Sequence, residues 1–249
     1  MSLNLPSAVE FCDVSYRLHH RFLIKHLDLN VYQGETLVLL GRSGSGKTTT
    51  LKLINNLLTP TQGEVLVQGK PTTRWDSIQL RRKIGYVIQE IGLFPHFTVE
   101  QNIAVVPQLL GWKRDRIQHR VNELLTLVSL EPAPNFAKRY PHQLSGGQRQ
   151  RVGVARALAA DPNLLLMDEP FGALDPITRL ELQREFRRLQ QQLGKTVIFV
   201  THDIQEAFVL ASRIGLMYEG QLVVLATPTE FKQSSHPEAQ AFLDCLKVD

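Results

Sequence analysis

Cysteine is scarce in this sequence, and the two residues present are isolated. Cys12 and Cys245 lie near opposite ends of the 249 residues. Neither belongs to a CxxC motif or to a cluster of cysteine and histidine with metal-ligand spacing. This pattern favours a reduced cytosolic protein over any thiol chemistry.

Long apolar runs are also missing. No stretch approaches the roughly 18 apolar residues that a membrane span requires. The start, MSLNLPSAVEF, has no basic segment followed by an apolar run. We therefore expect a chain that neither crosses a membrane nor is exported, so a partner must supply the spans if the protein works at a membrane.

A large excess of charge is the third absence. Lysine and arginine number 28 against 24 aspartates and glutamates, a formal net charge of 28 − 24 = +4. This balance tolerates nucleotides or an anionic membrane surface and selects neither. Hydrophobic residues make up 43% and charged residues 21% of the chain, which excludes a disordered or fibrous protein.

What is present is an alternation of strand and helix patterns. Apolar runs at 9–16, 27–31 and 36–40 predict strands. Further strand signals occur in GEVLVQGK, KIGYVIQ, NLLLMD, TVIFVTH, RIGLMY and QLVVLA. Helical spacing follows Lys47 as far as Pro60 and returns between Pro176 and Leu193. The alternation predicts an α/β fold with parallel strands.

Residues 90–161 differ from the rest because they contain helical patterns and no convincing strand. We expect a helical lobe inserted into the α/β fold. The predicted organisation is one domain over 1–249, with an α/β lobe at 1–89 and 162–249 and the helical lobe at 90–161.

The stretch GRSGSGKTTT carries the clearest chemistry. Gly41, Gly46, Lys47 and Thr48 satisfy the pattern G-x-x-x-x-G-K-[ST] between a predicted strand and a predicted helix. Glycines let backbone N–H groups point inward at a helix N-terminus, Lys47 adds a charge for the β and γ phosphates, and Thr48 suits Mg²⁺. This predicts a purine nucleoside triphosphate ligand. The predicted nucleotide contacts in the loop are Gly41, Arg42, Ser43, Gly44, Ser45, Gly46, Lys47, Thr48 and Thr49.

Polar residues at three other strand ends extend this site. Asp168 and Glu169 follow the apolar run NLLLM, where ligands of α/β proteins bind. Asp168 would hold Mg²⁺, and Glu169 would act as the base that activates water, unless both are acids of a surface turn. Gln89 can reach the metal and the water, and His202 can donate to the γ phosphate. Taken alone, each of these last two is more often a loop residue.

A second glycine-containing helix start, QLSGGQRQR from residue 143, completes a recognisable set. With it, the sequence resembles the ATP-binding cassette family of transporter ATPases over nearly the whole chain. Tyr16, GRSGSGKT, Gln89, LSGGQ, LLLMDE, the ALD at 173–175 and His202 occur in family order. The resemblance implies a P-loop NTPase with a RecA-like core sheet, antiparallel N-terminal strands and an inserted helical lobe, binding ATP and Mg²⁺.

The resemblance also implies a homodimer. Two cassettes meet head to tail, and the LSGGQ segment of each closes over the ATP that the other chain holds. Asp175 would bridge the chains at the dimer seam. Tyr16 would stack on adenine, the alternative being a core tyrosine. The residues expected to contact ATP in trans are Leu144, Ser145, Gly146, Gly147 and Gln148.

The segment QEIGLFPHFTVEQNIAVVPQLLGW, residues 89–112, points to a partner. Leu93, Phe94, Pro95 and Phe97 are either core residues or a socket that receives a helix of a transmembrane permease subunit, as the family does. The segment looks much like that of importers for quaternary amines such as glycine betaine, choline and carnitine. The expected location is cytoplasmic, at the inner face of the cell membrane, with an indirect link to a solute-binding protein.

Alternatives remain open at this stage. An importer of another small solute such as amino acids, or a soluble cassette ATPase acting on ribosomes, DNA or cluster assembly, fits the same motifs. A kinase or GTPase leaves LSGGQ unexplained. His19 and His20 fit a solvated turn better than a metal site. Arg179, Arg184, Arg187 and Arg188, interspersed with Glu181 and Glu185, fit an exposed helix face, so no nucleic-acid partner is expected.

Overall fold

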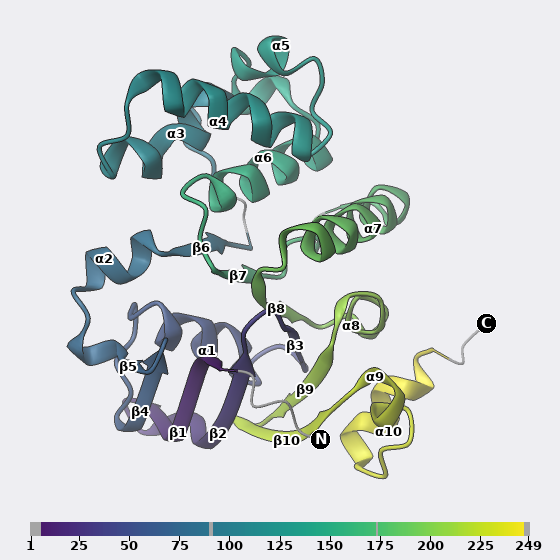
Figure 1. The fold of residues 1–249 in the computed structure, drawn as a ribbon. Helices are drawn as coiled ribbons and strands as arrows, with labels where there is room; N and C mark the ends of the chain where they lie inside the picture. The colour runs from purple at the N-terminus through teal and green to yellow at the C-terminus, as the bar shows by residue number, and fades with distance from the viewer. Residues whose placement is uncertain (1–5, 90–91, 173, 247–249) are drawn as a thin grey trace. The chain divides into compact units, whose positions relative to one another are not determined.

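The computed structural model describes residues 6–89, 92–172 and 174–246 (Figure 1). The chain divides into two compact units. The first unit combines Met1–Arg81 with Gly194–Asp249, and the second is Arg82–Leu193. Each unit buries its own set of apolar side chains.

The first unit contains a four-stranded antiparallel sheet with the order β2-β1-β4-β5. In β2, Leu27, Leu29 and Val31 are buried while the residues between them are exposed, so one face of this strand packs on the core. The predicted antiparallel N-terminal strands are confirmed. The bounds are β1 Ser7–Leu18, β2 Arg21–Tyr32, β4 Gln62–Val67 and β5 Lys70–Pro71.

One predicted strand is divided in two. The stretch GEVLVQGK forms β4 and β5, which are joined by a turn at Gln68 and Gly69. Both turn residues have positive φ, 54° and 72°. That conformation is the one that two-residue hairpin turns require, and it reverses the chain where a continuous strand was predicted.

The first unit also contains four strands in the order β10-β9-β3-β8. β3 lies parallel to β8 and β9, and β10 is antiparallel to β9. All residues of β3 and β8 are buried, as expected for parallel strands covered on both faces. The bounds are β3 Thr36–Leu40, β8 Thr196–Thr201, β9 Arg213–Tyr218 and β10 Gln221–Ala226.

Short helices accompany these strands. The helix α1 ends at Ile54, earlier than the predicted limit near Pro60, because Asn56 adopts a left-handed conformation with a φ of 53°. The N–H groups of Leu57 and Leu58 then both donate to the carbonyl oxygen of Lys52. The bounds are α1 Lys47–Ile54, η1 Thr72–Arg74, α2 Ser77–Arg82, α8 Ile204–Leu210, α9 Pro228–Phe231 and α10 Pro237–Asp244.

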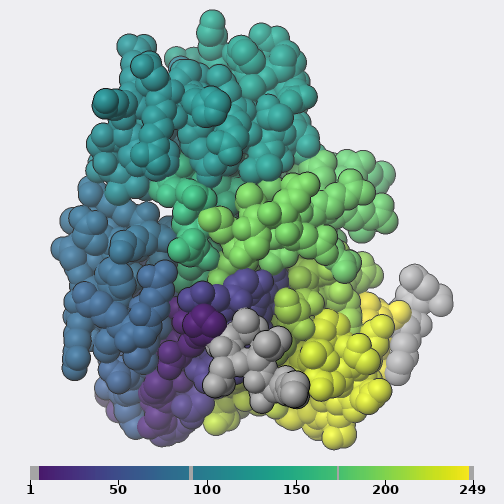
Figure 2. Space-filling model, in the orientation of Figure 1, coloured from purple at the N-terminus to yellow at the C-terminus, as the bar shows by residue number. Residues whose placement is uncertain are grey.

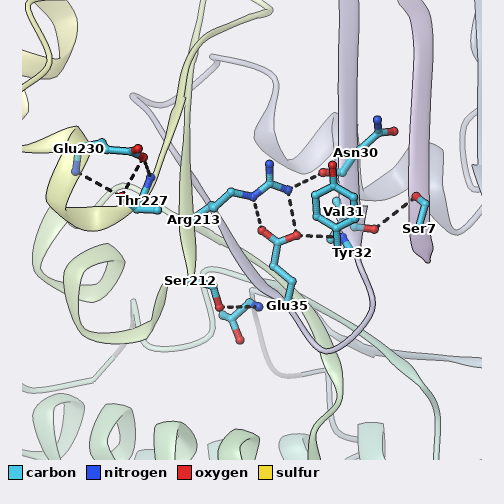
Figure 3. Close-up of polar contacts among 10 residues, drawn as sticks. Ser7, Asn30, Val31, Tyr32, Glu35, Ser212, Arg213, Thr227 and Glu230 are labelled. Atoms are coloured by element: carbon cyan, nitrogen blue, oxygen red, sulfur yellow. Dashed lines mark hydrogen bonds and ion pairs between the residues drawn. The ribbon is translucent and has the colours of Figure 1, made fainter. Parts of the chain in front are cut away.

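An ion pair fixes the start of β9 to the turn before β3 (Figure 3). The Arg213 guanidinium donates to both carboxylate oxygens of Glu35, at 2.5 and 2.9 Å, and to the carbonyl oxygen of Asn30 at 2.6 Å. Glu35 also accepts the backbone N–H of Tyr32. The hydrogen bonds to Glu35 raise the pKa of Arg213.

The second unit pairs two parallel strands, β6 Ile84–Val87 and β7 Leu164–Asp168, and is otherwise helical. In Figure 2, residues 99–137 are coloured teal and residues 176–193 green. Helices α3, α4 and α6 contact one another around Ile103, Leu124 and Val152, which are fully buried. The helices are α3 Val99–Leu109, α4 Arg114–Leu127, α5 Ala133–Ala137, η2 Pro141–Gln143, α6 Gly146–Leu158 and α7 Pro176–Leu193.

These elements agree with the predicted class. Within the described residues 92–161 there is no strand, and α7 begins and ends at the predicted residues. Residues 90 and 91 lie outside the described part, and the lobe boundaries at 89 and 162 stay a prediction. None of the helices in the described ranges combines the length and the apolar composition that crossing a bilayer requires.

Candidate functional site

The phosphate loop, residues 41–48, joins β3 to α1 and has no space for side chains at two of its glycines. A Cβ on Gly41 would clash with the carbonyl oxygen of Met217. One on Gly46 would lie 2.7 Å from the carbonyl oxygen of Leu23, and Gly46 has a φ of 106° that residues with a Cβ rarely adopt. The tight wrap of the loop therefore depends on glycine at both positions.

The N-terminus of α1 has features that favour an anion. Its N-cap, Gly46, forms no side-chain capping bond, and its first turn has no acidic residue. The first N–H groups of a helix have no partner within the helix, and together they carry about half a positive charge. A phosphate group can accept those N–H groups directly.

Two buried polar side chains in the loop also fit a phosphate. Lys47 is 5% exposed, and its Nζ donates to the carbonyl oxygens of Gly41 at 2.7 Å and Arg42 at 3.0 Å. The Ser45 Oγ is buried and has no hydrogen-bond partner within the described residues. An unpartnered buried hydroxyl costs roughly 1–3 kcal/mol, which a ligand oxygen would recover.

Arg42, also predicted to contact nucleotide, directs its side chain elsewhere. Its guanidinium donates to both oxygens of Glu238 on α10, at 2.6 and 3.2 Å, and this hydrogen bonding raises the pKa of Arg42. Only the backbone of Arg42 faces the loop, where its carbonyl accepts Lys47. The sequence predicts no separate role for α10, because an ion pair between residues 196 positions apart leaves no local sequence pattern.

The register of β3 and β8 brings His202 to the phosphate loop. Leu40 and Thr201, the last residues of these parallel strands, pair with each other. Gly41 and His202 therefore leave the sheet side by side at its carboxyl edge. His202 is exposed there, and its contact with a γ phosphate stays a prediction.

A cavity of about 560 Å³ borders the phosphate loop on the side of the β1–β2 turn. Its basic lining residues are His20, Arg21, Lys25 and Arg42. The sequence predicts a solvated turn at His20 and indicates no role for Arg21 or Lys25, although these residues belong to the basic run RLHHRFLIK. His19 and His20 do form the predicted turn, and no group of three or more metal-binding side chains occurs in the described ranges.

Tyr16 is half-buried on β1 and is not among the residues that line this cavity. It pairs with Ile24 on β2. Ile24 lies directly against the α-carbon of Gly46, since a Cβ there would be 2.7 Å from the Ile24 Cδ1. Tyr16 is thus one strand away from the phosphate loop, and its stacking on adenine stays a prediction.

In the second unit, Gln89 and Glu169 lie together. Val87 pairs with Met167, and Gln89 and Glu169 each lie two positions after these paired residues, so they reach the same edge. The Gln89 Nε2 donates to the Glu169 Oε2 over 3.4 Å, a long hydrogen bond that leaves the amide able to turn. Glu169 has a φ of 43°, which points its side chain out of the strand direction.

Asp168, the last residue of β7, is buried with 3% of its surface exposed. Burial, with a smaller contribution from the charge of Asp168, raises the pKa of Tyr86 on β6 to about 12. The phenol therefore stays neutral beside the carboxylate. A buried carboxylate at a strand end is a suitable ligand for Mg²⁺.

The start of α6 is capped by its own side chains. The Ser145 Oγ accepts the N–H of Gln148 at 3.2 Å, and the Gln148 Oε1 accepts the N–H of Ser145 at 3.0 Å. Ser145 is exposed and Leu144 is buried, so Leu144 anchors the segment while the Ser145 side chain lies at the surface. This N-terminus is thus capped by side chains, whereas the N-cap of α1 makes no side-chain capping bond.

Gly147 and Asp175 each have a structural task in the second unit. A Cβ on Gly147 would lie 2.8 Å from the Cγ2 of Thr178, so α6 and α7 meet here at glycine distance. Asp175 accepts the N–H of Thr178 at 3.0 Å, which caps α7 and lowers the pKa of Asp175. A role of Asp175 at a dimer seam stays a prediction, and its neighbour Ala173 lies outside the described residues.

The partner segment predicted at 89–112 presents an exposed aromatic loop and a groove. Asn102 is fully buried, and its amide donates to the carbonyl oxygens of Phe94 and Phe97 at 3.1 and 3.2 Å. Phe94 keeps 41% of its surface exposed. A groove of about 430 Å³ between α3 and α4 is lined in part by Ala104 and Trp112.

The sequence is similar to those of known proteins. A sequence profile of the family described as ABC transporter matches residues 24–172. The glycine betaine/carnitine/choline transport ATP-binding protein OpuCA of Bacillus subtilis is 54% identical over 207 residues, which are 83% of this chain and 54% of that protein. The glycine betaine uptake system ATP-binding protein YehX of Escherichia coli is 53% identical over 220 residues, 88% of this chain and 71% of that protein.

A solved structure has a similar fold. The dimeric bacterial ABC transporter cassette MJ0796 matches with a TM-score of 0.77 at 35% identity, covering 88% of this chain and 98% of that one. The predicted fold class and family resemblance are therefore confirmed. The chain spans about half the length of the OpuCA relative.

We predict that Gly147→Ala destabilises the protein. Alanine in a helix normally gains up to about 1 kcal/mol over glycine. Here the added Cβ meets the stiff Thr178 side chain, and overpacking of this kind costs about 1–3 kcal/mol. Urea unfolding should therefore show a net loss of stability.

The matched control removes the atom in the way. Thr178→Ser deletes only Cγ2, so the double variant Gly147→Ala/Thr178→Ser should recover the stability of Thr178→Ser alone or exceed it. An equal loss in both backgrounds would show that Gly147 is required for a reason other than the contact with α7.

Proposed function

The chain belongs to the ABC transporter family, and from this we propose that it is the ATP-hydrolysing subunit of an importer, working as a homodimer around two Mg-ATP. The observation that carries the nucleotide part is the phosphate loop. Its helix N-cap, Gly46, makes no side-chain capping bond, its lysine is buried within the loop, and its Ser45 hydroxyl has no partner within the described ranges.

The proposed roles follow from the chemistry of each residue. Lys47 exchanges its loop carbonyls for the β and γ phosphates. Thr48, Gln89 and Asp168 hold Mg²⁺, which when bound neutralises charge on the phosphates. Glu169 takes a proton from the attacking water, and Gln89, hydrogen-bonded to Glu169, orients that water. His202 donates to the γ phosphate at the edge where β8 ends.

Residues of a second copy complete the proposed site. Ser145 has a side chain at the surface at a capped helix start without a lysine, which suits a triphosphate that another chain already grips. Gly146 and Gln148 flank it, and Asp175 would lie at the seam. Because closure of the second copy excludes water and adds donors to the γ phosphate, hydrolysis requires the dimer.

A transmembrane permease is the proposed partner of the aromatic loop and the α3–α4 groove. Asn102 holds the loop backbone in place, so the exposed Phe94 ring is presented without a large loss of entropy on binding. Such a partner would locate the protein at the inner face of the cell membrane and connect it to a solute-binding protein. The transported solute is proposed to be a quaternary amine, supported by the names of the OpuCA and YehX relatives.

We predict that Glu169→Gln retains ATP binding and lowers turnover by about two to four orders of magnitude, because general-base assistance is lost. Phosphate release measures turnover, and equilibrium binding of nucleotide measures affinity. Glu181→Gln, a change of an exposed carboxylate on α7, serves as the control and should leave both unchanged. Full turnover in Glu169→Gln would refute the base assignment.

We predict that Ser145→Arg blocks hydrolysis and leaves ATP binding to a single chain intact. The arginine would occupy the space that the second copy's triphosphate needs. Nucleotide titration, light scattering and thermal unfolding separate binding, dimerisation and loss of the α6 cap. His119→Arg on α4 adds the same charge at another exposed position and should be neutral. Loss of ATP binding by the Ser145→Arg monomer would argue against a role in trans.

We predict that cells expressing the chain with its permease and binding protein take up labelled glycine betaine, choline or carnitine. Unlabelled quaternary amines should compete, because an aromatic site recognises their methylated cation, and unmethylated amino acids should not. Glu169→Gln should abolish uptake. Competition by amino acids alone would replace the substrate proposal and leave the ATPase proposal in place.

A further inference from the structure

A buried carboxylate lies directly behind the strand end that presents His202. Glu206, on the first turn of α8, is only 3% exposed. Its Oε2 accepts the hydroxyl of Thr201, the last residue of β8, over 2.6 Å. Thr201 is itself 2% exposed, so this hydrogen bond is made away from water. A short bond to a buried carboxylate is among the stronger hydrogen bonds in proteins.

The same hydroxyl fixes the backbone on the other side of His202. The Thr201 Oγ1 accepts the N–H of Asp203 at 2.9 Å. The Asp203 carboxylate in turn accepts the N–H of Gln205 at 2.8 Å and so caps α8. His202 is the single residue between two positions that this network fixes.

The position of Glu206 explains why the carboxylate is tolerated without exposure to solvent. It occupies the first turn of α8, where the helix dipole favours negative charge. An apolar residue would fill the same space but would leave the Thr201 hydroxyl without its acceptor. The buried carboxylate thus helps to hold the Thr201 side chain in one rotamer.

We propose that Glu206 is a positioning residue for His202, acting through the Thr201 hydroxyl. The inference rests on the proposed function, because it assumes that His202 contacts the γ phosphate. Glu206 itself touches no substrate. It sets where the backbone of His202 leaves β8 next to Gly41, and hence where the imidazole stands over the phosphate loop.

The test compares Thr201→Val and Glu206→Leu, which each break the bond, with Thr201→Ser, which keeps the hydroxyl. The first two should lower kcat about 10- to 100-fold, the usual range for residues that orient a functional side chain, with the KM for ATP within twofold. Thr201→Ser should stay near the parent rate. Thr196→Val is the matched control, since it removes another buried threonine hydroxyl of β8, the acceptor of the Gly34 N–H.

A direct readout of position accompanies the kinetics. The imidazole proton signal of His202, assigned with His202→Ala, should be single and sharp in the parent chain and in Thr201→Ser. It should broaden or split in Thr201→Val and Glu206→Leu, while the signals of the other histidines remain. In a His202→Ala background, the two bond-breaking changes should cost no further turnover.

The outcomes separate the two proposals. An unchanged His202 signal with lower kcat, an equal loss in the His202→Ala background, or the same loss in Thr196→Val would each overturn the role of Glu206. Parent-level hydrolysis by His202→Ala would instead overturn the proposed role of His202 in the reaction. Broadening of the His202 signal without any change in kcat would likewise overturn the positioning role.

Discussion

The structure of the first unit depends on how closely the phosphate loop packs against its neighbours. Gly46 meets Leu23 of β2, and Gly41 meets Met217 of β9, with no space for a methyl group at either point. Gly220 at the β9–β10 turn makes a similar approach to Leu23. The loop is therefore held by backbone from both sheets. That support lets a lysine remain buried among carbonyl oxygens and lets α1 begin without a capping side chain.

The two helix starts that the sequence identified as anion sites differ in their local hydrogen bonds. At α1 the N-cap Gly46 makes no side-chain capping bond and the first turn has no acidic residue. At α6, Ser145 and Gln148 already satisfy one N–H each. A triphosphate approaching α6 either shares or displaces these bonds, which weakens that contact. Under the proposed function, a stronger contact at α1 and a weaker contact at α6 would let the dimer separate after each hydrolysis event.

Local patterns predicted much of this architecture. The buried runs TLVLL and TVIFVT, the glycine loop and α7 could be read directly, because burial and helical spacing leave a period in the sequence. The pairing of Gln89 with Glu169 could be anticipated only from their place after strands. The ion pair of Arg42 with Glu238 and the clamp of Asn102 on Phe94 could not, since their partners depend on tertiary packing. The division of GEVLVQGK was missed because the turn conformation of Gln68 carries no strong signal.

The contact between the phosphate loop and α10 has a thermodynamic meaning. Arg42 supplies a carbonyl to Lys47 with its backbone and an ion pair to Glu238 with its side chain. Coupling between two binding events is reciprocal, so if bound nucleotide changes the affinity of α10 for a ligand by some factor, that ligand changes the affinity for nucleotide by the same factor. Under the proposed function, a ligand of α10 would change nucleotide affinity without entering the nucleotide site.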